Sequence, residues 1–204
     1  MRWLDHRETV PAPLRGAIIA LGNFDGFHLG HQAVAKEAID WARREGRPAI
    51  IATFDPHPVR FFKPDVPPFR LTTLEQRQEL YLDAGATAML VFHFDGALAG
   101  TSAEDFITEI LLDRLGAHGV VSGEDFTFGQ GAKGDVALLQ GFGAERGLAS
   151  RARAIRRRPH GSSPAPSPCA AWSSMATKEA VKSAIPPPTS RSRSICARIT
   201  GSMP

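Results

Sequence analysis

Residues 22–31, which read GNFDGFHLGH, constrain the fold of this chain more than any other stretch. They follow an apolar run at residues 17–21 that predicts a buried β-strand. They precede a segment in which Val34, Ala38 and Ala42 recur at helical spacing. The stretch is therefore predicted to be a strand-to-helix turn, the place where α/β proteins commonly bind phosphate groups.

The composition of this turn points to phosphate chemistry. Glycines allow the backbone to approach a ligand closely, and a helix N-terminus offers unpaired N–H groups to a phosphate. His28 and His31 are three residues apart at the predicted helix start, so their side chains share one face. An isolated histidine or glycine-rich turn is usually structural, but this spacing between a strand and a helix favours a chemical role. The chain contains no GxxxxGK(S/T) phosphate-binding loop.

Strand and helix patterns alternate through the rest of the first 150 residues. Further apolar strands are predicted at residues 48–54, 88–92 and 119–123, and helices are predicted to begin after the N-caps Thr73 and Ser102. This alternation predicts an α/β fold, a Rossmann-like, doubly wound parallel sheet with helices on both faces. Because such sheets bind ligands at the carboxyl ends of their strands, the loops that follow the strands should line one crevice.

Composition limits the class of protein. The sequence shows no secretory signal pattern and no apolar run that could cross a bilayer, so we expect a cytoplasmic protein. Cys169 and Cys196 lack metal-ligand spacing, so no metal site or disulfide framework is predicted. Residues 151–204 hold eight arginines and two lysines against one glutamate, whereas the preceding residues are acidic overall. The basic segment is open to two interpretations, a disordered tail or a nucleic-acid-binding arm.

Two more loops carry candidate binding residues. The DPHP sequence at residues 55–58 follows the second strand, and its prolines predict a sharp loop without helix, for which a plain proline turn is the alternative. Residues 123–129 read GEDFTFG. Aromatic side chains in loops usually fill the core, but they also stack on planar rings. Asp125 is able to accept hydrogen bonds from a base or a ribose hydroxyl.

Together and in this order, GNFDGFHLGH, DPHP and GEDFTFG resemble the adenylyltransferase module of the bacterial bifunctional riboflavin kinase/FAD synthetase family. The resemblance covers residues 15–150 approximately, and an HxGH sequence alone is shared with other nucleotidyltransferases. It implies an HxGH nucleotidyltransferase fold and transfer of AMP from ATP to FMN, which yields FAD and pyrophosphate with Mg²⁺. It implies that the chain binds the small molecules ATP and FMN and binds neither nucleic acid nor a membrane. It identifies no partner protein.

The resemblance also implies roles for individual residues. His28 and His31 would be catalytic, contacting the ATP phosphates as pyrophosphate leaves. The expected ATP-binding residues are Gly22, Asn23, Phe24, Asp25, Gly30 and Gly123. The expected flavin-binding residues are Phe54, Pro56, His57, Pro58, Asp125, Phe126 and Phe128. Because the FMN phosphate is already anionic, catalysis would need positioning and charge neutralisation but no general base.

The sequence departs from the family after residue 150. Members continue with an ISSTxxR motif, whose side chains bind phosphates, and with a riboflavin kinase domain that contains PTAN; this chain has neither motif. Back-translation of residues 175–190, read one base earlier, permits HGDKRGRExGYPTANI with x as Ile or Val, which resembles the start of that kinase domain. We therefore predict an adenylyltransferase domain at residues 1–150 and an out-of-frame, disordered tail at residues 151–204.

Loss of the ISSTxxR arginine would remove a cation from the phosphate site, so we expect FAD formation to be reduced or absent. Riboflavin kinase activity is expected only in an intact parent protein. The alternatives are a catalytically dead flavin- or nucleotide-binding protein and another HxGH nucleotidyltransferase, acting on a pantetheine or nicotinate nucleotide. DPHP and GEDFTFG argue against the latter. A nucleic-acid-binding module is least favoured, because a shifted frame through GC-rich codons explains the basic segment.

Overall fold

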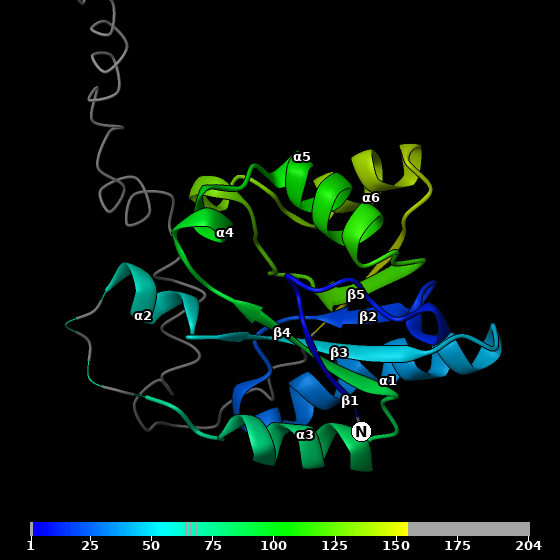
Figure 1. Ribbon diagram of the computed structural model, residues 1–204, viewed down its shortest axis with the longest axis horizontal. Helices are drawn as coiled ribbons and strands as arrows, with labels where there is room; N and C mark the ends of the chain where they lie inside the picture. Colours follow the sequence, from blue (N-terminus) through cyan, green and yellow to red (C-terminus); the bar gives the residue numbers. More distant parts are fainter. Residues whose placement is uncertain (1, 64, 66, 68, 155–204) are drawn as a thin grey trace, which may run out of the picture.

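The computed structural model describes residues 2–154 except 64, 66 and 68, and a six-stranded sheet lies at its centre (Figure 1). Every pair of neighbouring strands is parallel, in the spatial order β1-β4-β3-β2-β5-β6. The strands are β1 (Arg2–Asp5), β2 (Ile18–Leu21), β3 (Ala49–Asp55), β4 (Ala88–His93), β5 (Gly119–Gly123) and β6 (Ala149–Arg153). From residue 155 on, the predicted tail lies outside the described residues.

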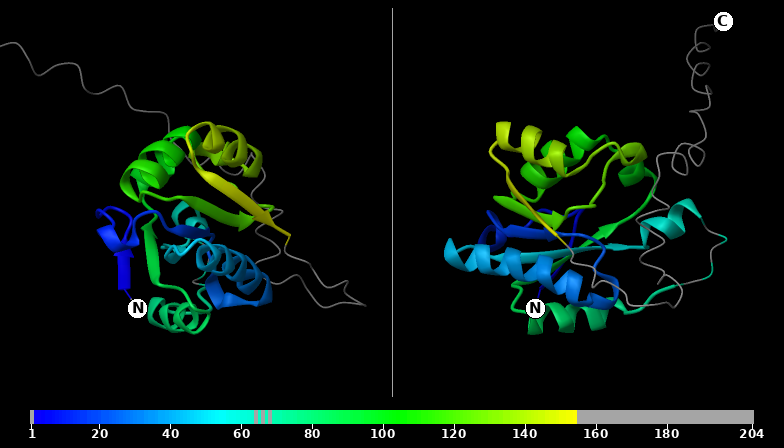
Figure 2. Two further views of the ribbon diagram at one scale, coloured as in Figure 1. Left: turned by 90° about the vertical axis from the view of Figure 1, so that its right-hand side faces the viewer. Right: turned by 180° about the vertical axis from the view of Figure 1, so that it is seen from behind.

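Helices connect the strands and cover both faces of the sheet (Figure 2). The longer ones are α1 (Leu29–Arg44), α3 (Leu74–Asp83), the π-helix η3 (Phe106–Arg114) and α6 (Val136–Glu145). The short ones are η1 (Ala12–Leu14), η2 (Asp25–Phe27), α2 (Pro58–Phe62), α4 (Gly96–Gly100), α5 (Ala103–Asp105) and η4 (Gln130–Ala132). In the described part of the chain, no helix combines the length and the apolar character that a membrane crossing requires.

Two apolar layers enclose the sheet, because its strands carry apolar side chains on both faces. One layer lies between the sheet and the helices α1 and α3, and its large buried members include Ile18, Trp41, Ile51, Tyr81 and Met89. The other lies between the sheet and the helices η3 and α6, and its members include Leu21, Leu90, Phe92, Ile107, Leu111 and Leu139. This arrangement confirms the predicted Rossmann-like, doubly wound α/β fold.

The sequence analysis missed the two edge strands. The strand β1 pairs with β4, and β6 pairs with β5 at the other edge. The β6 sequence, ASRAR, alternates between exposed and half-buried residues, so it lacks the apolar run that identifies a central strand. It also continues past residue 150, where the domain boundary is predicted. There the Arg151 guanidinium lies 4.1 Å from the Trp41 ring centroid and 3.0 Å from a Glu37 carboxylate oxygen.

Two helical segments also differ from the prediction. The helix that follows the N-cap Ser102 begins as α5 but continues as the π-helix η3, a wider turn in which the N–H of Leu115 donates to the carbonyl of Ile110. The prediction that no helix occurs within residues 55–58 is wrong at Pro58, where α2 begins. Proline suits the first position of a helix because the N–H that it lacks would have no partner there.

The order of the strands creates a switch point at the carboxyl edge of the sheet. From β2 the chain crosses to β3 on one side, whereas β5 lies on the other side of β2, with Leu21 aligned to Ser122. Open α/β sheets bind ligands at such a point. The turn after β2, Asp55 at the end of β3 and Gly123 at the end of β5 all lie at this edge.

Removal of β6 should destabilise the domain. A chain ending at residue 148 loses the pairing of β5 with β6 and the contacts of Arg151 with Trp41 and Glu37, and it leaves β5 as an open edge. A chain ending at residue 154 keeps all of these and is the matched control. We expect the shorter chain to melt at least ~4 °C below the longer one in thermal unfolding followed by circular dichroism. Equal melting temperatures would contradict the role of β6.

Candidate active site

The turn after β2 has a backbone that few residues adopt. Phe24 (φ 46°), Gly26 (φ 71°) and Phe27 (φ 34°) are left-handed, a conformation that costs little only for glycine. At Gly26 a Cβ atom would also lie 2.7 Å from the Leu71 Cδ1 atom. The buried rings of Phe24 and Phe27 both pack against Tyr81 of α3. The turn is therefore held in its strained conformation by α3.

His28 and His31 lie at the N-terminus of α1 with stacked rings, whose centroids are 3.6 Å apart. His28 is the N-cap, because its Nδ1 atom accepts the backbone N–H of His31 at 3.3 Å. The Nδ1 atom of His31 is buried without a hydrogen-bond partner. Burial is the main cause that lowers the pKa of both rings, and together with the neighbouring His28 it lowers the pKa of His31 to about 3. Both imidazoles are therefore neutral at pH 7 and would bind an anion through N–H donors.

Asp25 of the same turn has both carboxylate oxygens engaged by protein groups. The backbone N–H groups of Leu71 and Thr72 and the Thr72 hydroxyl donate to it over 2.8 to 3.2 Å, and Arg77 Nη2 lies 2.9 Å away. Burial alone would raise the pKa of Asp25, but the hydrogen bonds from Leu71 and Thr72 and the charge of Arg77 lower it. In this structure, Asp25 ties the turn to α3 and to the loop before it.

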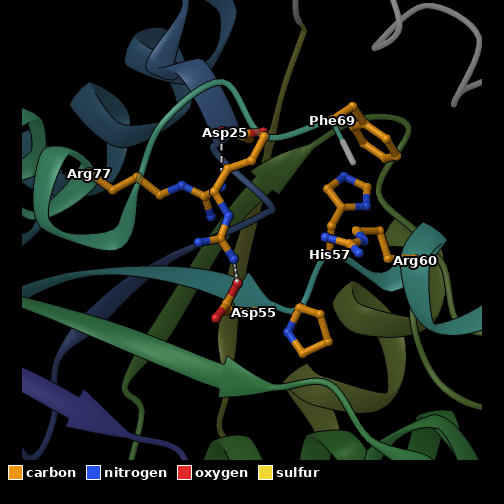
Figure 3. A pocket seen from close by; sticks show the side chains of 8 residues that line it. Asp25, Asp55, His57, Arg60, Phe69 and Arg77 are labelled. Atoms are coloured by element: carbon orange, nitrogen blue, oxygen red, sulfur yellow. Dashed lines mark hydrogen bonds and ion pairs between the residues drawn. The ribbon is translucent and has the colours of Figure 1, made fainter. Parts of the chain in front are cut away.

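The DPHP loop lines a pocket beside this turn, as Figure 3 shows. The Asp55–Pro56 peptide is cis, and Arg70 donates a hydrogen bond to Asp55. His57 caps α2 by accepting a backbone N–H at 3.2 Å, and its ring packs edge-on against Phe69 at 5.0 Å. Burial is the main cause that lowers the pKa of His57 to about 4. The pocket is lined by Asp25, Asp55, Pro56, His57, Arg60, Phe69, Arg70 and Arg77.

The predicted flavin-binding aromatic residues differ in their exposure. Phe54 stacks on Phe92, Phe92 packs against Phe106, and Phe106 packs against Phe128, which makes a continuous row of rings. Phe54 and Phe128 are each only 7% exposed and belong to the core. Phe126 is half-buried, and its ring stacks on Phe128 with centroids 5.7 Å apart. Of these three predicted residues, Phe126 keeps the most accessible surface.

The remaining predicted residues lie along the switch point. Gly22 and Asn23 follow β2, Gly123 ends β5 beside them, and Gly30 lies in the first turn of α1. Asp125 is exposed in the loop beyond β5. The side-chain oxygens of Asn23 and Ser122 are buried without a hydrogen-bond partner, as is Nδ1 of His31. Unsatisfied buried polar atoms are rare in folded proteins, and their grouping at one edge fits a site that binds a polar ligand.

The structure adds residues to the site that the sequence analysis did not single out. Arg77 of α3 and Thr53 of β3 are both buried, and the Arg77 Nη1 atom donates to the Thr53 hydroxyl at 2.8 Å. Arg70 reaches Asp55 from the loop before α3. The sequence does hold a signal for Arg77, because it lies one helical turn before Tyr81 on the buried face of α3. A charged side chain on a buried face needs a partner.

This arrangement is suited to bind a phosphate chain. The N-terminus of the 16-residue α1 carries unpaired backbone N–H groups and the positive end of the helix dipole. The histidine pair adds two neutral donors beside it. Arginines outnumber carboxylates in the adjacent pocket. Within the described residues, no cluster of three or more His, Cys, Asp or Glu side chains could hold a metal ion.

Comparisons with known proteins agree with the predicted resemblance. The chain matches the family model of FAD synthetase over residues 10–155. The bifunctional riboflavin kinase/FMN adenylyltransferase of Escherichia coli K12 is 35% identical over 137 residues, which are 67% of this chain and 44% of that relative. The putative bifunctional riboflavin kinase/FMN adenylyltransferase of Geobacillus thermodenitrificans is 36% identical over 135 residues, which are 66% of this chain and 73% of that protein.

The chain therefore spans less than half the length of the Escherichia coli relative that it matches. Among solved structures, one described as a macrolide-efflux protein from Streptococcus pneumoniae aligns with a TM-score of 0.62 at 21% identity. The alignment covers 76% of this chain and 52% of that one. At this identity the likeness supports the fold alone. The resemblance predicted from the three sequence motifs is confirmed by the family match.

Acidification should destabilise the folded domain through His31 and His57. Their pKa values in the folded protein, about 3 and about 4, lie below the ordinary value of 6.5 expected in the unfolded chain. As the pH falls from about 6.5 to about 4, the unfolded state binds protons that the folded state does not, so the free energy of unfolding decreases. We expect His31→Gln and His57→Gln each to flatten this slope in urea unfolding. An unchanged slope in both variants would contradict the burial of these rings.

Proposed function

Because the chain belongs to the FAD synthetase family, we propose that it is an FMN adenylyltransferase, which transfers AMP from ATP to FMN and releases pyrophosphate. The observation that carries this proposal is the stacked pair of His28 and His31 at the N-terminus of α1. This pair lies at the switch point of the sheet, beside the pocket lined by the DPHP loop. One site thus offers donors for a triphosphate and a neighbouring surface for a second substrate.

In the proposed reaction, a phosphate oxygen of FMN attacks the α-phosphorus of ATP. The bond from that phosphorus to the oxygen bridging to the β-phosphate breaks, and pyrophosphate leaves with the bonding electrons. The N–H groups of His28 and His31 would donate to the oxygens on which negative charge increases, as would the N-terminus of α1. No side chain needs to remove a proton, because the FMN phosphate is already ionised.

Mg²⁺ is part of the proposal as the counter-ion that accompanies ATP and neutralises phosphate charge. The described residues do not assemble three or more acidic, histidine or cysteine ligands, and Mg²⁺ bound with a nucleotide takes many of its ligands from phosphates and water. The proposed ATP-binding residues are Gly22, Asn23, Phe24, Asp25, Gly30 and Gly123. Asp25 would act indirectly, since its oxygens are engaged within the protein. A cytoplasmic location belongs to the same proposal.

The flavin is proposed to bind on the DPHP side of the site. Pro56 is exposed, His57 lines the pocket as a neutral ring, and the half-buried Phe126 offers a face on which a planar ring can stack. Pro58 and Asp125 flank this region in the proposal. Phe54 and Phe128 would support the flavin surface from the core, because both are nearly inaccessible.

A second candidate function, binding of both substrates without transfer, is favoured by one observation. The chain lacks the ISSTxxR sequence, so it lacks the arginine that the family resemblance places on the phosphates. Loss of one such donor typically slows a reaction by about 10²–10³-fold. The two functions differ in one readout, because a chain that only binds ATP and FMN releases no pyrophosphate.

The histidine pair provides the direct test. Incubation of the chain with ATP, FMN and Mg²⁺ should yield FAD and pyrophosphate in equal amounts, at a rate reduced by the missing ISSTxxR arginine, measured by chromatography and a coupled pyrophosphate assay. His28→Ala and His31→Ala should each lower the rate about 10²–10³-fold, because each removes a donor to the leaving phosphates. His118→Gln is the control, since His118 precedes the amino end of β5, whereas the site lies at the carboxyl ends of the strands. Substrate binding without pyrophosphate release by the unsubstituted chain would establish the second candidate instead.

We also propose that the adenylyltransferase domain predicted at residues 1–150 is followed by an out-of-frame segment. The family match extends to residue 155, and the strand β6 extends to Arg153. Both observations favour a frame change after residue 155. Sequencing of the coding DNA from codon 148 to codon 190 tests this, and we expect one inserted or missing base. The corrected gene should encode PTAN in frame, together with a further stretch of coding sequence that carries ISSTxxR, and its product should have riboflavin kinase activity. An unaltered frame would contradict the proposal.

A further inference from the structure

Arg77 joins three separate segments of the chain through three different nitrogen atoms. Its Nε atom donates to the Thr72 hydroxyl at 3.2 Å, and its Nη1 atom donates to the Thr53 hydroxyl at 2.8 Å. Its Nη2 atom lies 2.9 Å from the Asp25 carboxylate. These partners belong to the loop before α3, to β3 and to the turn after β2, and Arg77 itself is only 2% exposed. The planar guanidinium provides a fixed fork for such contacts, which a lysine cannot reproduce.

The partners of Arg77 hold the backbone of the turn at Asn23 and at Gly26. The Thr53 hydroxyl donates to the carbonyl of Asn23 at 2.6 Å, and the N–H of Gly26 donates to the Thr72 hydroxyl at 3.1 Å. Tyr81, one helical turn after Arg77, donates to the carbonyl of Phe24 at 3.3 Å. The turn that leads into the histidine pair is therefore fixed from α3 and from β3 along most of its length.

The same ion pair lies between the two halves of the site. Asp25 and Arg77 line the pocket together with His57, and Figure 3 shows Arg77 extending from its helix toward Asp25. Both charges also act on the rings of His31 at the start of α1 and of His57 in the DPHP loop. A shift of this pair would change the spacing between the histidines of α1 and the DPHP loop.

We propose that Arg77 is a positioning residue for adenylyl transfer, which fixes the turn carrying His28 and His31 relative to the DPHP loop. The proposal rests on the function proposed above and extends it to a residue outside the three sequence motifs. Arg77 acts through Asp25, Thr53 and Thr72, and its fork geometry matters as well as its charge. A misplacement of about 1 Å far from the reacting atoms can slow an enzyme about 10²-fold, which sets the expected effect.

Three variants separate positioning from general stability. Arg77→Lys keeps the charge but loses the fork, and Thr53→Val removes the hydroxyl between Asn23 and Arg77 while keeping the side-chain shape. Leu111→Ala is the matched control, because Leu111 is fully buried in the layer on the opposite face of the sheet. Urea unfolding of each variant gives the stability loss and defines conditions in which the chain is folded.

Two readouts follow for each folded variant. For Arg77→Lys we expect kcat to fall about 10²-fold while KM for ATP changes less than about 3-fold, and for Thr53→Val we expect a smaller loss of the same kind. The second readout is the His31 resonance in a proton NMR titration, assigned with His31→Gln. The chemical shift of this resonance should stay constant between about pH 5 and about pH 8 in the unsubstituted chain. It should titrate in Arg77→Lys, because a His31 ring that is no longer held in place becomes hydrated and its pKa rises toward the ordinary value.

The outcomes are distinct. The proposal is supported if Leu111→Ala loses as much stability as Arg77→Lys, or more, but keeps its kcat per folded molecule and leaves the His31 resonance unshifted. The loss of kcat in Arg77→Lys is then an effect of positioning and not of lower stability. If Arg77→Lys keeps kcat within about 3-fold and leaves the titration unchanged, the proposal is wrong. If the unsubstituted chain makes no FAD, the proposed function fails, and the His31 titration alone still decides whether Arg77 holds the histidine pair.

Discussion

The buried ion pair of Asp25 and Arg77 is the interaction on which the site depends. Burial of two charges is costly, and removal of one partner from such a pair typically costs about 3–5 kcal/mol because the other charge is left uncompensated. Here both oxygens of Asp25 and all three nitrogens of Arg77 have a hydrogen-bond or ion-pair partner, and apart from the pair itself these partners come from β3 and from the loop before α3. That saturation allows a turn with three left-handed residues to persist at the end of β2. The conformation of this turn in turn determines the position at which α1 and its histidine pair begin.

The parallel sheet explains why motifs far apart in the sequence share one site. All six strands end at the same edge, so the turns after β2, β3 and β5 are neighbours although about a hundred residues separate the first from the last. Burial at this edge keeps His31 neutral in the free protein. A bound phosphate chain would favour the charged form of the ring, because a nearby negative charge raises a histidine pKa.

The central strands, the helix α1 and the placement of His28 and His31 at its start were predictable because each has a local signal. The apolar runs and the HxGH spacing depend only on neighbouring residues. The edge strand β6 was not predictable, because its half-exposed residues carry no apolar run. The role of Arg77 was not predictable in detail, since its partners Asp25 and Thr53 come from distant parts of the sequence.

The three motifs contain residues of two physical kinds, and the structure separates them. Phe24, Asp25 and Phe128 have buried side chains that pack or hydrogen-bond within the protein. His28 and Phe126 keep accessible surface at the same edge. A motif match alone assigns both kinds to ligand binding. A buried side chain whose polar atoms already have protein partners has few hydrogen-bonding groups free for a substrate. The burial of the first kind therefore argues that these residues fix the backbone conformation from which the second kind would contact a ligand. Substitutions of the first kind should therefore act on stability and turn geometry together, whereas those of the second kind act on binding.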